Sequence, residues 1–110
     1  MIDELVPELD ASAQRFNIRM FEGDAINFEW VVPDTATWAG TYEFKVLAGG
    51  VVLTLNVSVT AQGLDAKFSV VDSPQPELLA TTSGYPWDVH DIGSDVTRFA
   101  GLLLVDEQVA

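Results

Sequence analysis

The sequence predicts an all-β protein, folded as a single sandwich or small barrel of about seven antiparallel strands with one short helix and an N-terminal arm. Segments of alternating apolar and polar residues recur along the chain, separated by glycine-containing turns at intervals of about 8–12 residues. A length of 110 residues with 48% apolar residues suits one domain with one core. The chain has no cysteine, so packing rather than disulfides must stabilise it, and a thiolate metal site is excluded.

The charge balance restricts the partners of the chain. There are 17 acidic and 5 basic residues, a formal net charge of −12, which repels phosphate backbones, so we expect no nucleic-acid binding. No apolar run approaches the roughly 20 residues that cross a membrane. The acidic N-terminus lacks the basic region of a signal peptide. We therefore expect neither membrane association nor export by that route, and we interpret the charge as a source of solubility or as a surface for a basic partner.

Residues 1–14 are expected to form an arm ahead of a β-sandwich domain spanning residues 15–110. The apolar residues of the arm, Leu5, Val6 and Leu9, are too few for an amphipathic helix. The arm either frays or lies on a neighbouring subunit. In the second case these three residues are contact residues.

The first half of the domain contains four alternating segments, residues 16–21, 26–32, 41–47 and 51–60. Each is typical of a half-buried strand, because every second residue of a strand faces the same side. Trp38 lies in the loop between the second and third segments. It either covers the core as a lid, the interpretation we favour, or serves as an exposed contact residue.

The second half begins with a further strand over residues 64–71. Ser73 is a suitable N-cap before Pro74, which predicts a short helix over residues 74–81 that covers an open end of the sheets. A hairpin with strands at 85–91 and 96–105 closes the chain.

Within this closing hairpin, Tyr85, Trp87 and Val89 alternate with polar residues and are expected to close the core. Gly101 interrupts the last strand and indicates a bulge or a close approach by an aromatic neighbour. The run that follows is apolar on both faces, more than one core requires. Its residues Leu102, Leu103 and Leu104 are therefore candidate contact residues.

Candidate catalytic and metal-binding residues are few. His90, the single histidine, is expected to face solvent. Asp88, Asp91 and Asp95 at the end of the hairpin are hard oxygen ligands of the kind that Ca²⁺ prefers, but carboxylates in turns usually form the turn itself. There is no Gly-x-Ser-x-Gly motif and no glycine-rich phosphate loop. We therefore expect no enzyme, no cofactor and no metal.

Several features, in this order, resemble a known family. A Gly-Asp turn opens an alternating strand at residues 22–30, and a strand, a glycine turn and a second strand at 57–68 lead to the expected helix. An aromatic-x-aromatic-Asp strand at 85–89 then precedes a glycine-containing apolar strand at 98–105. Over residues 15–107 this order resembles the immunoglobulin-like N-terminal domain of the upper baseplate proteins of tailed bacteriophages. The chain departs from that family at residues 33–40, where the family has a longer apolar connection ending in Leu-Thr-Gly.

The resemblance implies an immunoglobulin-like sandwich and a non-enzymatic virion structural protein, made in the host bacterial cytoplasm and assembled on the particle in multiple copies. Its implied partners are other virion proteins and copies of itself, with a tail or baseplate location favoured. Two alternatives remain open. One is a capsid decoration protein bound to the major capsid protein. The other is a small carbohydrate-binding module that uses Trp38 and turn carboxylates.

Overall fold

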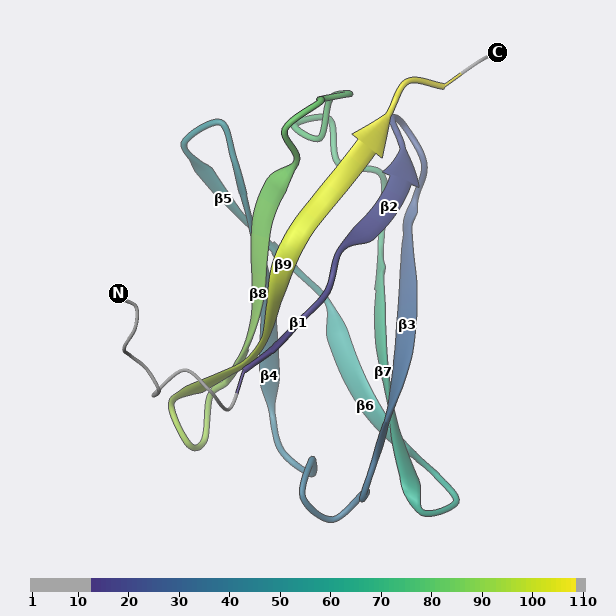
Figure 1. Ribbon diagram of the computed structural model, residues 1–110, viewed down its shortest axis with the longest axis vertical. Coiled ribbons are helices and arrows are strands. Elements are labelled where there is room, and N and C mark those ends of the chain that lie inside the picture. The colour runs from purple at the N-terminus through teal and green to yellow at the C-terminus, as the bar shows by residue number, and fades with distance from the viewer. Residues whose placement is uncertain (1–12, 109–110) are drawn as a thin grey trace.

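The computed structural model describes residues 13–108, which form two β-sheets packed face to face (Figure 1). This arrangement confirms the all-β class and is that of a sandwich. The strands within this range are β1 (Gln14–Arg15), β2 (Ile18–Phe21), β3 (Ile26–Pro33), β4 (Tyr42–Ala48), β5 (Val51–Leu55), β6 (Val57–Gln62), β7 (Asp65–Asp72), β8 (Tyr85–Asp91) and β9 (Val96–Asp106).

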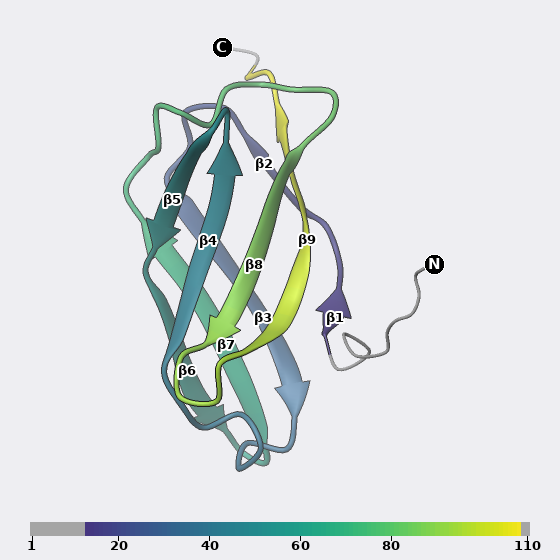
Figure 2. The ribbon, with the colours of Figure 1, turned by 90° about the vertical axis from the view of Figure 1, so that its left-hand side faces the viewer.

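One sheet has six strands in the order β1-β9-β8-β4-β5, with β2 also paired to β9, and the other has three strands in the order β3-β7-β6. Figure 2 looks onto the six-stranded sheet, with β5, β4, β8 and β9 side by side in front of the second sheet. The closing hairpin that the sequence predicts is present as β8–β9, and it lies within the larger sheet.

The expectation that all strands pair antiparallel is wrong at the N-terminus. Both β1 and β2 pair parallel with β9, with Gln14 opposite Phe99 and Ile18 opposite Leu103. Because β3 belongs to the opposite sheet, β1 and β2 do not form a hairpin with the strand that follows them but lie at the edge of the six-stranded sheet beside β9. Sequence periodicity identifies a strand but carries no information about its partner or direction.

The segment 51–60, expected as one strand, is two. It divides at Asn56, where the chain leaves the six-stranded sheet and enters the three-stranded sheet. The backbone groups freed by this crossing are paired: the Asn56 N–H donates to Asp72 Oδ2 (3.2 Å), and the Val71 N–H donates to the Asn56 carbonyl (3.2 Å).

The short helix expected over residues 74–81 is absent. A single turn, in which the Leu78 N–H donates to the Gln75 carbonyl (3.0 Å), stands in its place and directs the buried Leu78 side chain into the core. Pro76 explains the difference, because a proline biases the residue before it, here Gln75, away from the helical region. Among residues 13–108 there is no helix, and hence none that could cross a membrane.

The core between the sheets is rich in aromatic rings. Trp30 stacks on Phe68 (ring centroids 5.3 Å apart), and Phe44 stacks on Trp87 (5.0 Å). Phe16 meets Trp87 edge to face at 5.0 Å. Trp87 is thus a core residue, as expected, and Trp30 packs against the core. Their ring centroids lie 6.2 Å apart across the two sheets, so this cluster joins the sheets in a chain that has no disulfide.

Candidate interaction surface

The apolar run at the end of β9 presents two faces. Leu103 is fully buried in the core, whereas Leu102 is 36% exposed on the outer face of the six-stranded sheet and Leu104 is half-buried there. Gly84 packs against both outward leucines, since a Cβ built on it would lie 2.9 Å from Leu104 Cδ2 and 3.3 Å from Leu102 Cβ. Leu102 and Leu104 therefore remain contact candidates, but Leu103 does not.

Trp38 is a lid over the core and not an exposed contact residue. Its side chain is buried, its ring stacks on Phe99 (centroids 5.1 Å apart), and its indole N–H donates to the Pro33 carbonyl (3.0 Å). The Arg98 guanidinium lies 5.6 Å from the centre of the indole ring on Trp38, a cation–π contact. Because its ring is covered, Trp38 offers no platform on which a sugar could stack.

The remaining contact candidates, Leu5, Val6 and Leu9, lie outside the described residues. Gln14, the last residue assigned to the arm, is already part of β1.

The outer face of the six-stranded sheet carries a line of apolar residues that crosses four strands. We call it the outer apolar row. It consists of Val52 on β5, Leu47 on β4, Pro86 on β8 and Leu102 on β9, all exposed.

The strand register brings the members of this row together. Val52 pairs with Leu47, and Pro86 pairs with Leu102. The pairing of Val46 with Trp87 places Leu47 beside Pro86. Leu47 and Val52 are 46% and 57% exposed and border a shallow hollow of about 290 Å³ on this face. The row is thus a continuous apolar surface that nothing in residues 13–108 covers.

Sequence reasoning missed Leu47, Val52 and Pro86 as contact candidates, although two of them leave a signal. Leu47 follows Glu43 and Lys45 at the outward positions of its strand, and Val52 is an apolar residue at an otherwise polar phase. Each is a departure from the alternation that a half-buried strand requires.

A second line of residues runs beside the outer apolar row, one step along the strands. In it Lys45 on β4 pairs with Asp88 on β8, with Thr54 and Ala100 on the flanking strands. The Lys45 ammonium also lies 3.5 Å from a carboxylate oxygen of Glu43. This face therefore combines an apolar row with a pair of opposite charges at its centre.

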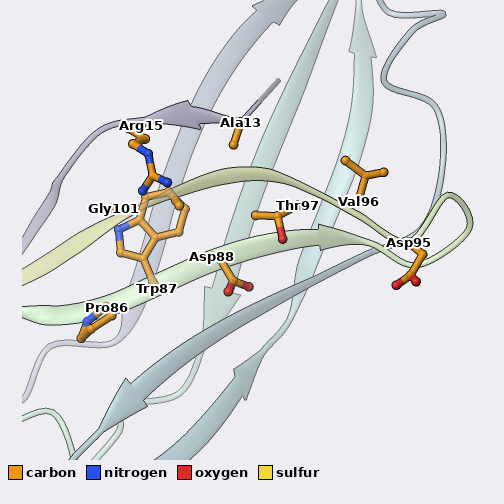
Figure 3. Close-up of a pocket in the computed structure, with 10 residues that line it drawn as sticks. Ala13, Arg15, Pro86, Trp87, Asp88, Asp95, Val96, Thr97 and Gly101 are labelled. Carbon is orange, nitrogen blue, oxygen red and sulfur yellow. The ribbon is translucent and has the colours of Figure 1, made fainter. Parts of the chain in front are cut away.

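An open hollow of about 580 Å³ adjoins the outer apolar row between β1, β8 and β9, and Pro86 and Asp88 are among its lining residues. Figure 3 shows Arg15 extending from β1 towards Trp87, Asp88 in the middle of β8, and Asp95 apart on the β8–β9 turn. The two carboxylates do not converge, so the hollow offers no cation site. It adds apolar and acidic surface to the face.

Asp91 at the end of β8 is a turn former. Its Oδ1 accepts hydrogen bonds from the N–H groups of Gly93 (3.1 Å) and Ser94 (3.3 Å), and Arg98 Nη2 lies 3.7 Å from its Oδ2. Burial acts to raise the pKa of Asp91, but hydrogen bonds from Ser94 and Gly93 and the Arg98 charge together hold it below its ordinary value. The Asp91 carboxylate thus stabilises the β8–β9 turn.

His90 lies on the outer face of the six-stranded sheet, as expected, with its side chain 30% exposed. Its Nε2 lies 2.8 Å from Oδ1 of Asp95, a residue held at a φ of 58° on the β8–β9 turn. This contact ties the turn to β8. In the part of the chain that the structure describes, no three His, Asp or Glu side chains gather as a metal-binding group.

Burial and nearby charges also shift the pKa of a tyrosine, Tyr42, at this end of the sheet. Burial raises the pKa of Tyr42, the Asp91 carboxylate raises it further, and Arg98 acts in the opposite direction. The Tyr42 hydroxyl donates to the Trp38 carbonyl (2.8 Å), so it supports the lid.

A scan with protein-family models finds no match to the chain, and no curated protein matches it.

Proposed function

We propose that this chain is an immunoglobulin-like, non-enzymatic structural protein of a tailed-bacteriophage virion, assembled on the particle in multiple copies. The tail or baseplate is the favoured location and capsid decoration the alternative. The observation that carries the proposal is the outer apolar row, an exposed apolar line across four strands of a regular sheet.

Strand order supports the immunoglobulin-like part of the proposal. In the constant-type immunoglobulin fold, strands B, D and E share one sheet and strands C, F and G share the other, and variable types add strands beside C. Here β3, β6 and β7 form one sheet and correspond to B, D and E. The strands β4, β8 and β9 lie in the other sheet and correspond to C, F and G, with β5 beside β4.

Tyr85 supports the same assignment. It stands at the start of β8, and its hydroxyl donates to the Leu79 carbonyl six residues upstream (2.7 Å). Immunoglobulin-like folds carry such a tyrosine corner at this position, two residues before their second cysteine. Here Trp87 occupies that cysteine position, and its ring centroid lies 6.2 Å from that of Trp30 on β3 of the opposite sheet, so an aromatic contact between the sheets stands where the disulfide would be.

The outer apolar row supports an assembly role because it differs from the outer face of the other sheet. There the exposed valines, Val31 and Val71, stand singly opposite the polar residues Lys67 and Asn27. Scattered exposed apolar residues are normal on a monomer, whereas a contiguous line of them is typical of an interaction site. With a net charge of −12 the chain can keep this surface soluble until it is covered.

Mass spectrometry of purified virions of the phage that encodes the chain tests the proposal. We expect the chain in intact particles at many copies, and its absence would refute the virion role. Separated heads and tails then distinguish a tail or baseplate protein from a capsid decoration protein.

A further inference from the structure

We propose that the outer face of the six-stranded sheet pairs with the same face of a second copy of this chain, about a two-fold axis that runs parallel to the strands between β4 and β8. The inference rests on the proposed function in one respect, that this face is an assembly surface. It adds the identity of the partner and the register of the contact.

The strand order makes the face self-complementary. A two-fold axis between β4 and β8 exchanges these two strands, and it exchanges β5 with β9. Because Leu47 stands beside Pro86 in the sheet, the axis places Leu47 over Pro86 of the second copy. It places Val52 over Leu102 of the second copy in the same way. The outer apolar row is thereby covered along its whole length by the same row.

The charged residues on this face favour a second copy of the chain over an unrelated partner. Lys45 and Asp88 are cross-strand neighbours on β4 and β8, so the same axis places Lys45 over Asp88 of the second copy. Symmetry repeats the contact, which gives two opposite-charge pairs per dimer. Face-to-face sheets pack about 10 Å apart with a relative twist of about 30°, and residues this close to the axis stay in register despite that twist.

Net charge opposes the association without preventing it. Each copy carries −12, but repulsion between exposed charges is screened beyond about 8 Å at physiological ionic strength. The dimer is therefore best measured at about 0.15 M salt, where short-range contacts at the face outweigh long-range repulsion.

Sedimentation velocity of the full chain, over a concentration series, is the first test. We expect a species of twice the 12.0 kDa chain mass, and its fraction should increase with protein concentration. Val52→Asp is expected to abolish it. Val71→Asp is the matched control, since both valines lie in strands and are 57% and 58% exposed, but Val71 is on the opposite sheet. A dimer that survives Val52→Asp, or that Val71→Asp abolishes equally, would overturn the proposed face.

Charge exchange tests the register, and both variants change side chains on the surface of the folded chain. Lys45→Glu and Asp88→Lys are each expected to raise the dimer Kd at least about 100-fold, because each places like charges face to face. An equimolar mixture of the two variants is expected to recover a dimer, since every facing pair is then of opposite sign. No recovery in the mixture would overturn the register.

The outcomes separate this inference from the proposed function. A chain that stays monomeric throughout the concentration series, yet is present in virions, refutes the self-pairing and leaves the virion role intact. A dimer that follows the charge exchange, from a chain absent from virions, supports the pairing and refutes the virion role.

Discussion

Replacing Gly101 with alanine is expected to release the N-terminal strand from β9. A Cβ built on Gly101 lies 1.7 Å from the carbonyl oxygen of Phe16 and 2.8 Å from its carbonyl carbon. Both atoms belong to the backbone, so no rotamer change relieves the clash. The chain must instead move the Phe16–Asn17 segment away from β9, or shift β9 itself.

The contacts at stake set the size of the effect. Two hydrogen bonds hold the segment, from the Phe16 N–H to the Ala100 carbonyl (3.1 Å) and from the Leu102 N–H to Asn17 Oδ1 (3.2 Å). At about 1 kcal/mol each they contribute about 2 kcal/mol. Withdrawal of the partly buried Phe16 ring from the aromatic core costs about 2 kcal/mol more. Because overpacked sites often relax for about 1–3 kcal/mol, we expect Gly101→Ala to lower the free energy of unfolding by about 2–4 kcal/mol.

Urea denaturation measures the loss, and amide exchange at Phe16 and Leu102 locates it. Gly93→Ala is the matched control, because a Cβ there meets only Asp91 Oδ1 at an ordinary 3.6 Å. Its stability should stay within about 0.5 kcal/mol of the wild type. If Gly101→Ala were as stable as Gly93→Ala, the close approach of Phe16 would not be what requires glycine.

Four further substitutions test the fold. Tyr85→Phe should lower the free energy of unfolding by about 1 kcal/mol, since it removes the bond to the Leu79 carbonyl; unchanged stability in urea would refute a tyrosine corner. Leu103→Asp should prevent folding because it buries an unpaired carboxylate, whereas the circular dichroism of Leu104→Asp should match the wild type. Failure of both would show that neither leucine faces outward. Asp91→Asn should be less stable than the wild type near neutral pH. The pKa of Asp91 is lower in the folded protein than its ordinary value of 3.8, so the ionised carboxylate stabilises the fold at every pH above that value. That difference should disappear as the pH falls below about 3.8, and a pH-independent difference would contradict it.

The closing hairpin illustrates how far sequence reasoning reaches. Tyr85, Trp87 and Val89 were expected on the core face, and Trp87 and Val89 are buried there while the half-buried Tyr85 packs against them. A period of two is a local property, and one face of each strand must leave water, so the pattern is sufficient. Gly101 was expected to mark a bulge or a close approach by an aromatic residue. An aromatic neighbour does approach, since a Cβ built on Gly101 would lie 3.2 Å from Nε1 of Trp87. The tightest contact is with the backbone of Phe16, and the irregularity in pairing lies between Val89 and His90.

The candidate surface shows where sequence reasoning stops. Leu102, Leu103 and Leu104 could be singled out because an apolar run on both faces breaks the alternation. Which of them faces outward depended on the register of β9 against its neighbours, and that register also assembles Leu47 and Val52 into the same row. Each of the latter two is an isolated exception in the sequence, and only strand pairing makes them adjacent.

By itself, the sequence determined what depends on neighbouring residues: an all-β chain, the phase of most strands, the turns and the acidic surface. The tertiary structure decided what depends on distant residues. These are the parallel pairing of β1 and β2 with β9, the change of sheet at Asn56, and the loss of a helix to a turn that inserts Leu78 into the core. The physical reason is that alternation specifies which side of a strand leaves water, whereas partner and direction are set by whichever edge and cavity the rest of the chain leaves open.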